Sequence, residues 1–327
     1  MASEDPTVTM YYDPYDRALS GTGSWHKAQF HLHHIRLNAA GTDYNESLEP
    51  VEEIFREYKA ADYSIVGQSS YRALHDTAQI AAKVGLRSVN GQEYVRYDGL
   101  LLMGISSFKE GSPQEVVDAT VADGGFAVIC HPNQNPELVG DLIPPLLTRE
   151  MSRPLTGVVG VEVYNGCLSR RHLNGVGFGS GIATDYWDEA LSCGRRLWGF
   201  ASDDSHNRYE INVGWTEIWA GSTEFAALRA SIERGAIVAS RGMRLFGWEF
   251  DGESLTVEAD LPYFRAYSAD YRFIGRGGEV LQMQSGRRAT YRLRGDEPYV
   301  RVQATSADGS TLWTQPLLRA DRFEVPT

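Results

Sequence analysis

The sequence predicts an α/β fold, with a barrel of βα units followed by a small antiparallel β domain. The chain has 327 residues, which suits one large domain plus an appendage. Apolar runs alternate with helical patterns up to about residue 240, as is typical of βα units around a parallel sheet. About six or seven such units fit a closed barrel better than an open sheet. We therefore expect a barrel over residues 1–243 and a β domain over residues 244–327.

Six short apolar runs, each ending at polar or turn-forming residues, predict the barrel strands. In order they are "QFHLH" (29–33), "YSIVG" (63–67), "LRSVNGQEYV" (86–95), "FAVIC" (126–130), "GVVGVEVYN" (157–165) and "LWGFAS" (197–202). Apolar residues at helical spacing occupy 51–58, and Ser112–Glu115 is a capping box with proline at the first helical position. Further helices are expected over 184–193 and 222–234, because a glycine follows each.

The residues after about 245 carry a different pattern. Apolar and polar residues alternate, and Asp-Gly pairs at 251–252 and 308–309 are typical of hairpin turns. No convincing helix appears in this region of the sequence. The pattern therefore predicts antiparallel strands packed on the barrel.

Charge and composition exclude several classes of partner. The chain has 31 basic and 43 acidic residues, so its net charge of −12 argues against nucleic acid, which requires a basic surface. No run of 18 apolar residues is present, so we expect no membrane span. The start "MASEDPTVTM" does not resemble a secretory signal, and three widely spaced cysteines suggest reduced thiols in a cytoplasmic protein. The expected partner is a small-molecule substrate, and no motif indicates an oligomeric state.

Metal-ligating residue types occur at the ends of the predicted strands, which is where βα barrels place their reactive groups. His31 and His33 lie two apart on a strand, so their side chains share a face. The remaining strand-end residues are Glu93, His131, Glu162, Asn165, Asp203, Asp204 and His206. Imidazole and carboxylate together are ligands that zinc, iron and manganese accept. The sequence therefore predicts a metal site at this end of the barrel.

This ligand mixture indicates hydrolysis by a metal-activated water. We expect the first ion to be held by a set comprising His31, His33, Glu93 and Asp204. Glu93 can be shared with a second ion held by His131, with His206 nearby as a ligand or as an acid–base group. The expected catalytic residues are thus Glu93, Asp204 and His206. No dinucleotide-binding, Walker or nucleophile-elbow motif is present, so no organic cofactor is required.

Other polar residues near the strand ends are candidates for substrate contacts. They are Arg36, Asn38, Gln68, Asn133, Asn165 and Arg171. For those on loops, a solvated surface position is the alternative. Glu162 and Asp203 are expected to support the ligands rather than to bind metal. His34 points away from its two neighbours and is expected to be structural.

The motifs resemble those of the PHP (polymerase and histidinol phosphatase) superfamily. "HLH" at 31–33, "GQEY" with Glu93, "ICHPN" with His131 and "SDDSH" with Asp204 and His206 follow the family order over about residues 25–240. The C-terminal segment "YVRVQATSADGSTLWTQPL" is similar to that of PHP hydrolases related to carbaryl-hydrolase-type enzymes. The resemblance implies a distorted seven-stranded (β/α) barrel, up to three divalent metals and, most often, phosphoester hydrolysis.

Two departures from the family pattern change the expected chemistry. "HIRLNAAG" offers Asn38 where the family carries an acid or a histidine, and "VGQSS" places Gln68 and Ser69 where it carries Asp and His. Amides and hydroxyls are poor ligands for zinc or iron, so we expect one or two divalent ions (Zn, Mn or Fe) rather than three. The predicted function is a metal-dependent hydrolase of a phosphoester or of an ester, amide or carbamate. The alternative is a degenerate, non-catalytic relative that binds a ligand or partner.

Overall fold

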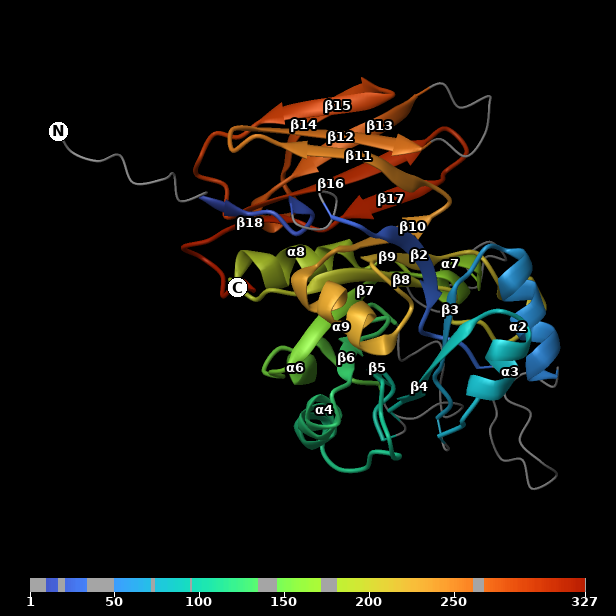
Figure 1. Cartoon of the computed structure of the whole chain (residues 1–327). Coiled ribbons are helices and arrows are strands. Elements are labelled where there is room, and N and C mark those ends of the chain that lie inside the picture. The colour runs from blue at the N-terminus through green and yellow to red at the C-terminus, as the bar shows by residue number, and fades with distance from the viewer. Residues whose placement is uncertain are drawn as a thin grey trace.

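The computed structural model describes residues 10–16, 21–33, 50–71, 74–94, 96–134, 146–171, 181–260 and 268–326, and the side chains of Arg170 and Arg171 lie outside the description. The fold is mixed α/β, with one large sheet and a separate three-stranded antiparallel sheet. Figure 1 shows the C-terminal strands, coloured orange to red, layered on one side of the part that contains β2–β10, with α2 and α3 beside β3 and β4.

Seven consecutive strands form the part of the large sheet that carries the strand ends of interest. They are β2 (Ser24–Gln29), β3 (Ile65–Gln68), β4 (Arg87–Glu93), β5 (Leu100–Met103), β6 (Phe126–Ile129), β7 (Val158–Asn165) and β8 (Trp198–Ser202). Neighbouring strands are parallel except β5, which runs antiparallel to both β4 and β6. The other six strands therefore point the same way, and their carboxyl ends meet at one edge.

Two features of this region differ from the sequence prediction. The first strand ends at Gln29, so the His-Leu-His segment lies just beyond it rather than within a strand over 29–33. Its backbone is fixed by an isolated parallel bridge between Leu32 and Ser205. The sequence analysis also missed β5, a fully buried run of four residues that returns alongside β4 as a hairpin. This run is too short for its direction to be inferred from periodicity.

Four helices lie near the predicted residues: α2 (Val51–Ala60), α4 (Pro113–Ala122), α8 (Thr184–Ser192) and α9 (Phe225–Arg234). Three shorter helices were not predicted: α3 (Ala78–Lys83), α6 (Arg149–Ser152) and α7 (Gly166–Arg171). The capping box at the start of α4 is confirmed: Ser112 N donates to Glu115 Oε2 at 2.7 Å. The last helix ends at Gly235, whose φ of 80° is accessible to glycine at low cost.

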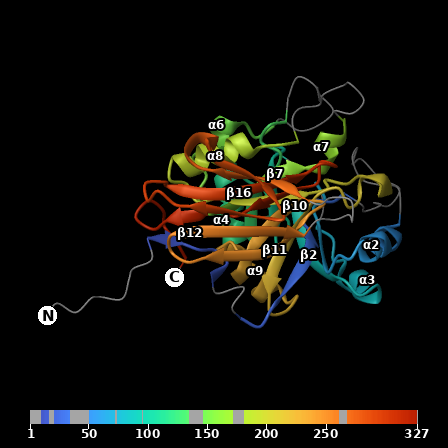
Figure 2. The ribbon, with the colours of Figure 1, turned by 90° about the horizontal axis from the view of Figure 1, so that it is seen from above.

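The large sheet continues from β2 through antiparallel pairs into the C-terminal strands. The order is β2, β9 (Trp215–Ala220), β10 (Ile237–Arg241), β17 (Thr311–Thr314), β16 (Tyr299–Ser306), β18 (Leu317–Arg319) and β1 (Tyr11–Tyr12), with β13 (Ala269–Ile274) and β14 (Val280–Gly286) branching from β16. The separate sheet contains β11 (Arg244–Phe250), β12 (Ser254–Asp260) and β15 (Arg288–Arg292). Figure 2 shows β11, β12 and β16 crossing the near face of the molecule. A division of the chain at residue 243 stays a prediction.

Aromatic side chains fill the core between the helices and the large sheet. Trp187 on α8 and Trp198 on β8 are both completely buried, and a second cluster lies between the C-terminal sheets. Arg301 on β16 reaches Asp188 on α8 through two hydrogen bonds of 2.6 and 2.7 Å, which joins the C-terminal strands to the helical layer. Among the described residues, no helix is long and apolar enough to cross a membrane.

Candidate metal centre

Six buried ligand-type side chains converge at the edge where the parallel strands end. Each is at most 6% exposed, and the set comprises His31, His33, Glu93, Asp98, His131 and Asp204. The first two follow β2, and the others lie at the end of β4, before β5, after β6 and after β8. His131 and Asp204 have φ angles of 29° and 50°, a region that non-glycine residues rarely adopt and that recurs at functional sites.

Four side chains face a common point and form the first group. His31 Nε2 lies 3.2 Å from both Glu93 Oε2 and Asp204 Oδ1. His33 Nε2 lies 3.1 Å and 3.4 Å from the same two oxygens. Ligand atoms bound at about 2.0–2.1 Å in a tetrahedral site are separated by roughly 3.3 Å, so these spacings fit a single divalent ion.

Glu93, Asp98 and His131 form the second group. Glu93 Oε1 lies 3.0 Å from His131 Nε2, which is in turn 3.5 Å from Asp98 Oδ1. The two oxygens of Glu93 therefore face two different groups, as in a carboxylate shared by two ions. Asp98 was not among the residues expected from the sequence. It precedes β5, and because β5 is antiparallel to β4, the beginning of β5 meets the end of β4. An Asp-Gly pair before an apolar run was the available signal.

Hydrogen bonding within the protein leaves several of these atoms unsatisfied. His33 Nδ1 and Nε2 and Asp98 Oδ1 are buried without a hydrogen-bond partner among the described residues. His33 Nε2 has no hydrogen-bond partner even though Glu93 Oε2 is only 3.1 Å away. The nitrogen and this oxygen therefore face a shared point rather than each other. Buried polar atoms normally have partners. The orphaned atoms fit the donor set of a metal ion.

The carboxylates of the site raise the pKa values of His31 and His131 against the effect of burial. Burial lowers the pKa of His31, but the carboxylates of Asp204 and Glu162 outweigh this and raise it well above its usual value. Burial lowers the pKa of His131 too, and Asp98 and Glu93 more than compensate, bringing it to about 9. Binding of an ion to these histidines would therefore compete with protons.

Glu162 on β7 supports the ligands from behind. Its Oε1 lies 2.8 Å from His31 Nδ1 and accepts a short hydrogen bond from Ser202. Its Oε2 accepts from the His131 backbone N at 3.0 Å and from Asn165 Nδ2 at 3.2 Å. Asn165 also donates to Asp204 Oδ2 at 3.1 Å. Glu162 thus contacts ligand side chains.

Asp203 holds the loop that carries Asp204 by bonding the backbone at the far end of that loop. Its carboxylate accepts three backbone N–H bonds of 2.7–3.0 Å from residues 212–214. Burial nevertheless leaves the pKa of Asp203 raised above its usual value. Its role in the structure is to hold the loop after β8, which carries Asp204.

Gln68 and Ser69 turn toward the backbone between the first two histidines. Gln68 Nε2 donates to Leu32 O at 3.1 Å. Ser69 Oγ donates to the same carbonyl at 3.1 Å and accepts from Leu32 N at 3.0 Å. Tyr71, which sequence reasoning missed and which no pattern signals, stacks on the His33 ring at 4.8 Å. These residues position the His-Leu-His segment.

His206 lies beside the first group, with its Nδ1 3.9 Å from Asp204 Oδ1. Its ring stacks on His33 with centroids 4.5 Å apart, and its Nδ1 is 3.0 Å from Asp204 O. Its ligand atom groups with those of Cys167 and Glu210. Of the substrate-contact candidates, Asn133 bonds Ile182 O and Asp185 and is partly exposed, whereas Arg36, Asn38 and the Arg171 side chain lie outside the described residues. His34, which was expected to be structural, also lies outside them.

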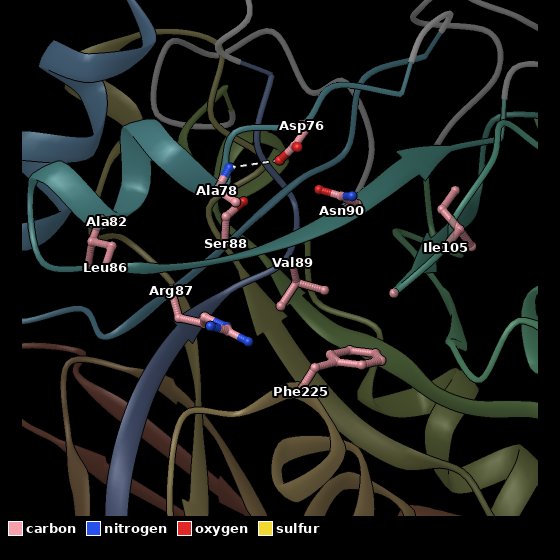
Figure 3. Close-up of a pocket in the computed structure, with 11 residues that line it drawn as sticks. Asp76, Ala78, Ala82, Leu86, Arg87, Ser88, Val89, Asn90, Ile105 and Phe225 are labelled. Atoms are coloured by element: carbon pink, nitrogen blue, oxygen red, sulfur yellow. Dashed lines mark hydrogen bonds between the residues drawn. The ribbon is translucent and has the colours of Figure 1, made fainter.

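A cavity of about 760 Å³ adjoins the second group. Its lining includes Asp98, His131, Asn133, Leu147 and Arg149. Another cavity, of about 350 Å³, lies along the first half of β4, with Arg87 and Phe225 in its wall (Figure 3). Arg87 bonds Glu224 at 2.6 Å, and no metal-capable group found among the described residues includes a residue of that wall. Of these two cavities, the first adjoins the site and the second does not.

Comparison with known proteins gives only distant neighbours. No model of a protein family matches the chain, and no curated protein matches it. The chain is similar to a two-domain protein from Bacteroides vulgatus that contains a predicted PHP-like metal-dependent phosphoesterase, with a TM-score of 0.49, 11% identity and coverage of 90% of this chain and 96% of that chain. It is also similar to PsfC from Pseudomonas syringae, with a TM-score of 0.38, 8% identity and coverage of 64% and 87%. Both TM-scores lie below 0.5, so neither neighbour determines the function of this chain.

Proposed function

We propose that this protein is a metal-dependent hydrolase that uses one or two divalent transition ions. The observation that carries the proposal is the placement of Glu93, whose two carboxylate oxygens face two separate groups of buried ligand atoms. Nitrogen and oxygen donors of this kind suit zinc, manganese or iron. When bound, such ions lower the pKa of a water molecule and polarise the oxygen of the substrate.

The chain's own residues would hold and orient this centre. A first ion would be bound by the four-residue set of His31, His33, Glu93 and Asp204. Glu93, His131 and Asp98 would hold the second. Glu162 would keep His31 Nδ1 protonated, so that Nε2 presents its lone pair to the ion. The adjoining cavity would receive the substrate beside His131.

The proposed architecture is a distorted seven-stranded barrel of the PHP type formed by β2–β8. In support, the segment after the last of these strands meets the segment after the first. The His33 backbone N donates to Ser205 O at 2.8 Å, next to the bridge between Leu32 and Ser205.

The charge of the site favours an uncharged scissile group. Two dications would face three ligand carboxylates, from Glu93, Asp98 and Asp204, with the buried Glu162 directly behind them. These charges leave no net positive charge to attract a dianionic phosphate. An ester, amide or carbamate is therefore the preferred substrate class, and a phosphoester is the other.

A non-catalytic binding protein is the second candidate. Gln68 and Ser69 favour it, because both are engaged with the Leu32 backbone and contribute no ligand. A protein of this kind would be folded and would bind a small molecule or partner without turnover.

The test combines metal analysis with substrate panels. We expect the purified protein to bind up to two equivalents of Zn²⁺ or Mn²⁺ at the Glu93 centre and then to hydrolyse members of an ester, amide and carbamate panel faster than phosphoesters. His31→Ala/His33→Ala should abolish first-ion binding and turnover. His26→Ala is the matched control, because His26 lies on β2 but bonds only peripheral groups. Full turnover by metal-free protein would contradict the proposal, and a folded, metal-binding but inert protein would favour the non-catalytic candidate.

A further inference from the structure

A thiol, an imidazole and a carboxylate gather beside the Glu93 centre without belonging to it. Their ligand atoms, from Cys167, His206 and Glu210, all lie within 4.8 Å of one another. Cys167 is in the first turn of α7, after β7, and the other two residues flank the turn after β8. Because β7 and β8 are parallel neighbours, both segments emerge at the same edge. The backbone N of Cys167 donates to Asp203 O at 2.8 Å, which joins the two segments.

Contacts within the cluster and with the neighbouring His33 ring hold His206 and Glu210 in place. The His206 backbone N donates to Glu210 Oε2 at 2.7 Å, and His206 Nδ1 is 4.0 Å from the same oxygen. Stacking of the His206 ring on His33, with 19° between the ring planes, fixes its orientation. An ion binding here would therefore meet a cluster that is largely organised already, which lowers the entropic cost of binding.

Burial of the cluster is graded. Cys167 is 2% exposed, whereas His206 and Glu210 are half-buried. Two of the three ligand-type side chains are thus partly accessible to solvent. Three protein ligands also leave one tetrahedral position for water.

We propose that Cys167, His206 and Glu210 form a separate binding site for a thiophilic divalent cation such as Zn²⁺. Sulfur, nitrogen and oxygen donors together suit zinc, whereas magnesium and calcium require oxygen ligands. Cys167, His206 and Glu210 share no residue with the two groups at Glu93, although a further group there, formed by His31, Cys130 and His131, also contains a thiol. The ion of the proposed site would be additional to those at Glu93, and it would hold the loop after β8 against the start of α7.

The experiment is a Co²⁺ titration of the full-length protein followed by absorption spectroscopy. Cobalt substitutes for zinc, and a thiolate ligand adds a charge-transfer band in the near ultraviolet. We expect this band in the wild type, its loss in Cys167→Ser and its displacement by Zn²⁺. Glu210→Gln keeps the Cys167 thiolate, so its band should still form. Titration of that band should show weaker Co²⁺ binding than in the wild type. Circular dichroism checks that each variant is folded.

Two further cysteines supply the controls. Cys193→Ser removes an exposed thiol and should leave the band unchanged. Cys130→Ser removes the buried thiol 3.5 Å from Glu93 Oε1 and should leave it unchanged as well. Loss of the band in Cys130→Ser but not in Cys167→Ser would place the sulfur ligand at the Glu93 centre and overturn the proposal, as would a wild type without a band.

The proposal and the hydrolase function can fail independently. In the His31→Ala/His33→Ala background the first group loses two ligands, but Cys167, His206 and Glu210 remain. The cobalt band should persist there at an amplitude that corresponds to about one thiolate-bound ion. Its disappearance in that background would show that the cluster is not a separate site.

Discussion

His31 and Glu162 are joined by a contact of 2.8 Å between Nδ1 of the imidazole and Oε1 of the carboxylate, and both side chains are buried. The contact fixes which ring nitrogen carries the proton. With Nδ1 donating to Glu162, Nε2 faces Glu93 and Asp204, each 3.2 Å away. Glu162 thereby sets the tautomer and the orientation of the His31 ring, while His31 Nε2 is left to bind the proposed ion.

Glu162→Gln should lower the affinity of the first ion by about 10–100-fold, the usual effect of removing a group that orients a metal-binding histidine. The amide keeps the size of the side chain but loses the charge that favours donation from His31. Competition with a chromogenic chelator measures the change. Glu297→Gln is the matched control, because Glu297 is a buried carboxylate bonded to Tyr11 and Tyr291 in the C-terminal strands. Equal affinities in the two variants would show that Glu162 does not support the site.

Asp98→Asn should reduce binding from two ions to one. Its Oδ1 is a buried atom without a hydrogen-bond partner, 3.5 Å from His131 Nε2. An amide oxygen is a weaker ligand, whereas the four residues of the first group are unchanged. Equilibrium dialysis with metal analysis counts the ions. Asp123→Asn, at an exposed carboxylate bonded to Lys109, should leave the count unchanged. Two tightly bound ions in Asp98→Asn would remove Asp98 from the ligand set.

Much of the site could be predicted because its residues follow apolar runs. Glu93, His131 and Asp204 come directly after short buried strands, and parallel strands bring their ends together whatever the connecting helices do. The capping box at Ser112 and the glycine at 235 marked helix ends for similarly local reasons.

The missed features depend on side-chain direction and on chain reversal. Asp98 joins the site only because β5 turns back along β4. Gln68 and Ser69 could be recognised as unusual, but their bonds to Leu32 depend on where the His-Leu-His backbone lies beyond β2. The stacking of His206 on His33 is likewise a relationship that no linear pattern encodes.

Lys27 should make the free energy of unfolding increase with pH in the alkaline range. Its ammonium bonds Ala61 O at 2.9 Å and lies over the Trp215 ring, and burial lowers its pKa to about 8 despite the nearby Asp203 and Glu217. Between about pH 8 and the unfolded value of about 10.4, the unfolded lysine keeps a proton that the folded lysine has lost. The free energy of unfolding therefore gains up to about 1.4 kcal/mol per pH unit from this group as pH rises.

Urea unfolding of wild type and Lys27→Met from pH 7 to 10 isolates this contribution, since tyrosine ionisation affects both proteins alike. The stability of the wild type relative to Lys27→Met should increase with pH across that window. Parallel pH curves would mean that Lys27 remains charged in the folded state.

The buried pair between Asp188 and Arg301 should control the stability of the junction between the helical layer and the C-terminal strands. Tyr299 OH also donates to Asp188 Oδ1 at 3.0 Å, and the guanidinium lies over the Trp187 ring. Asp188→Ala leaves a buried guanidinium without its counter-charge, which costs about 3–5 kcal/mol. Adding Arg301→Met removes that charge, so the double variant should be more stable than the sum of the two single effects indicates.

Urea titrations followed by circular dichroism test this coupling. Arg292→Ala is the control, because its partner Glu253 is exposed, and such pairs contribute about 1 kcal/mol or less. Because the buried pair joins residues on both sides of position 243, we also expect the wild type to unfold in one transition. Additive single effects would show that Asp188 and Arg301 do not stabilise each other, and two separate transitions would show that the regions before and after residue 243 unfold independently.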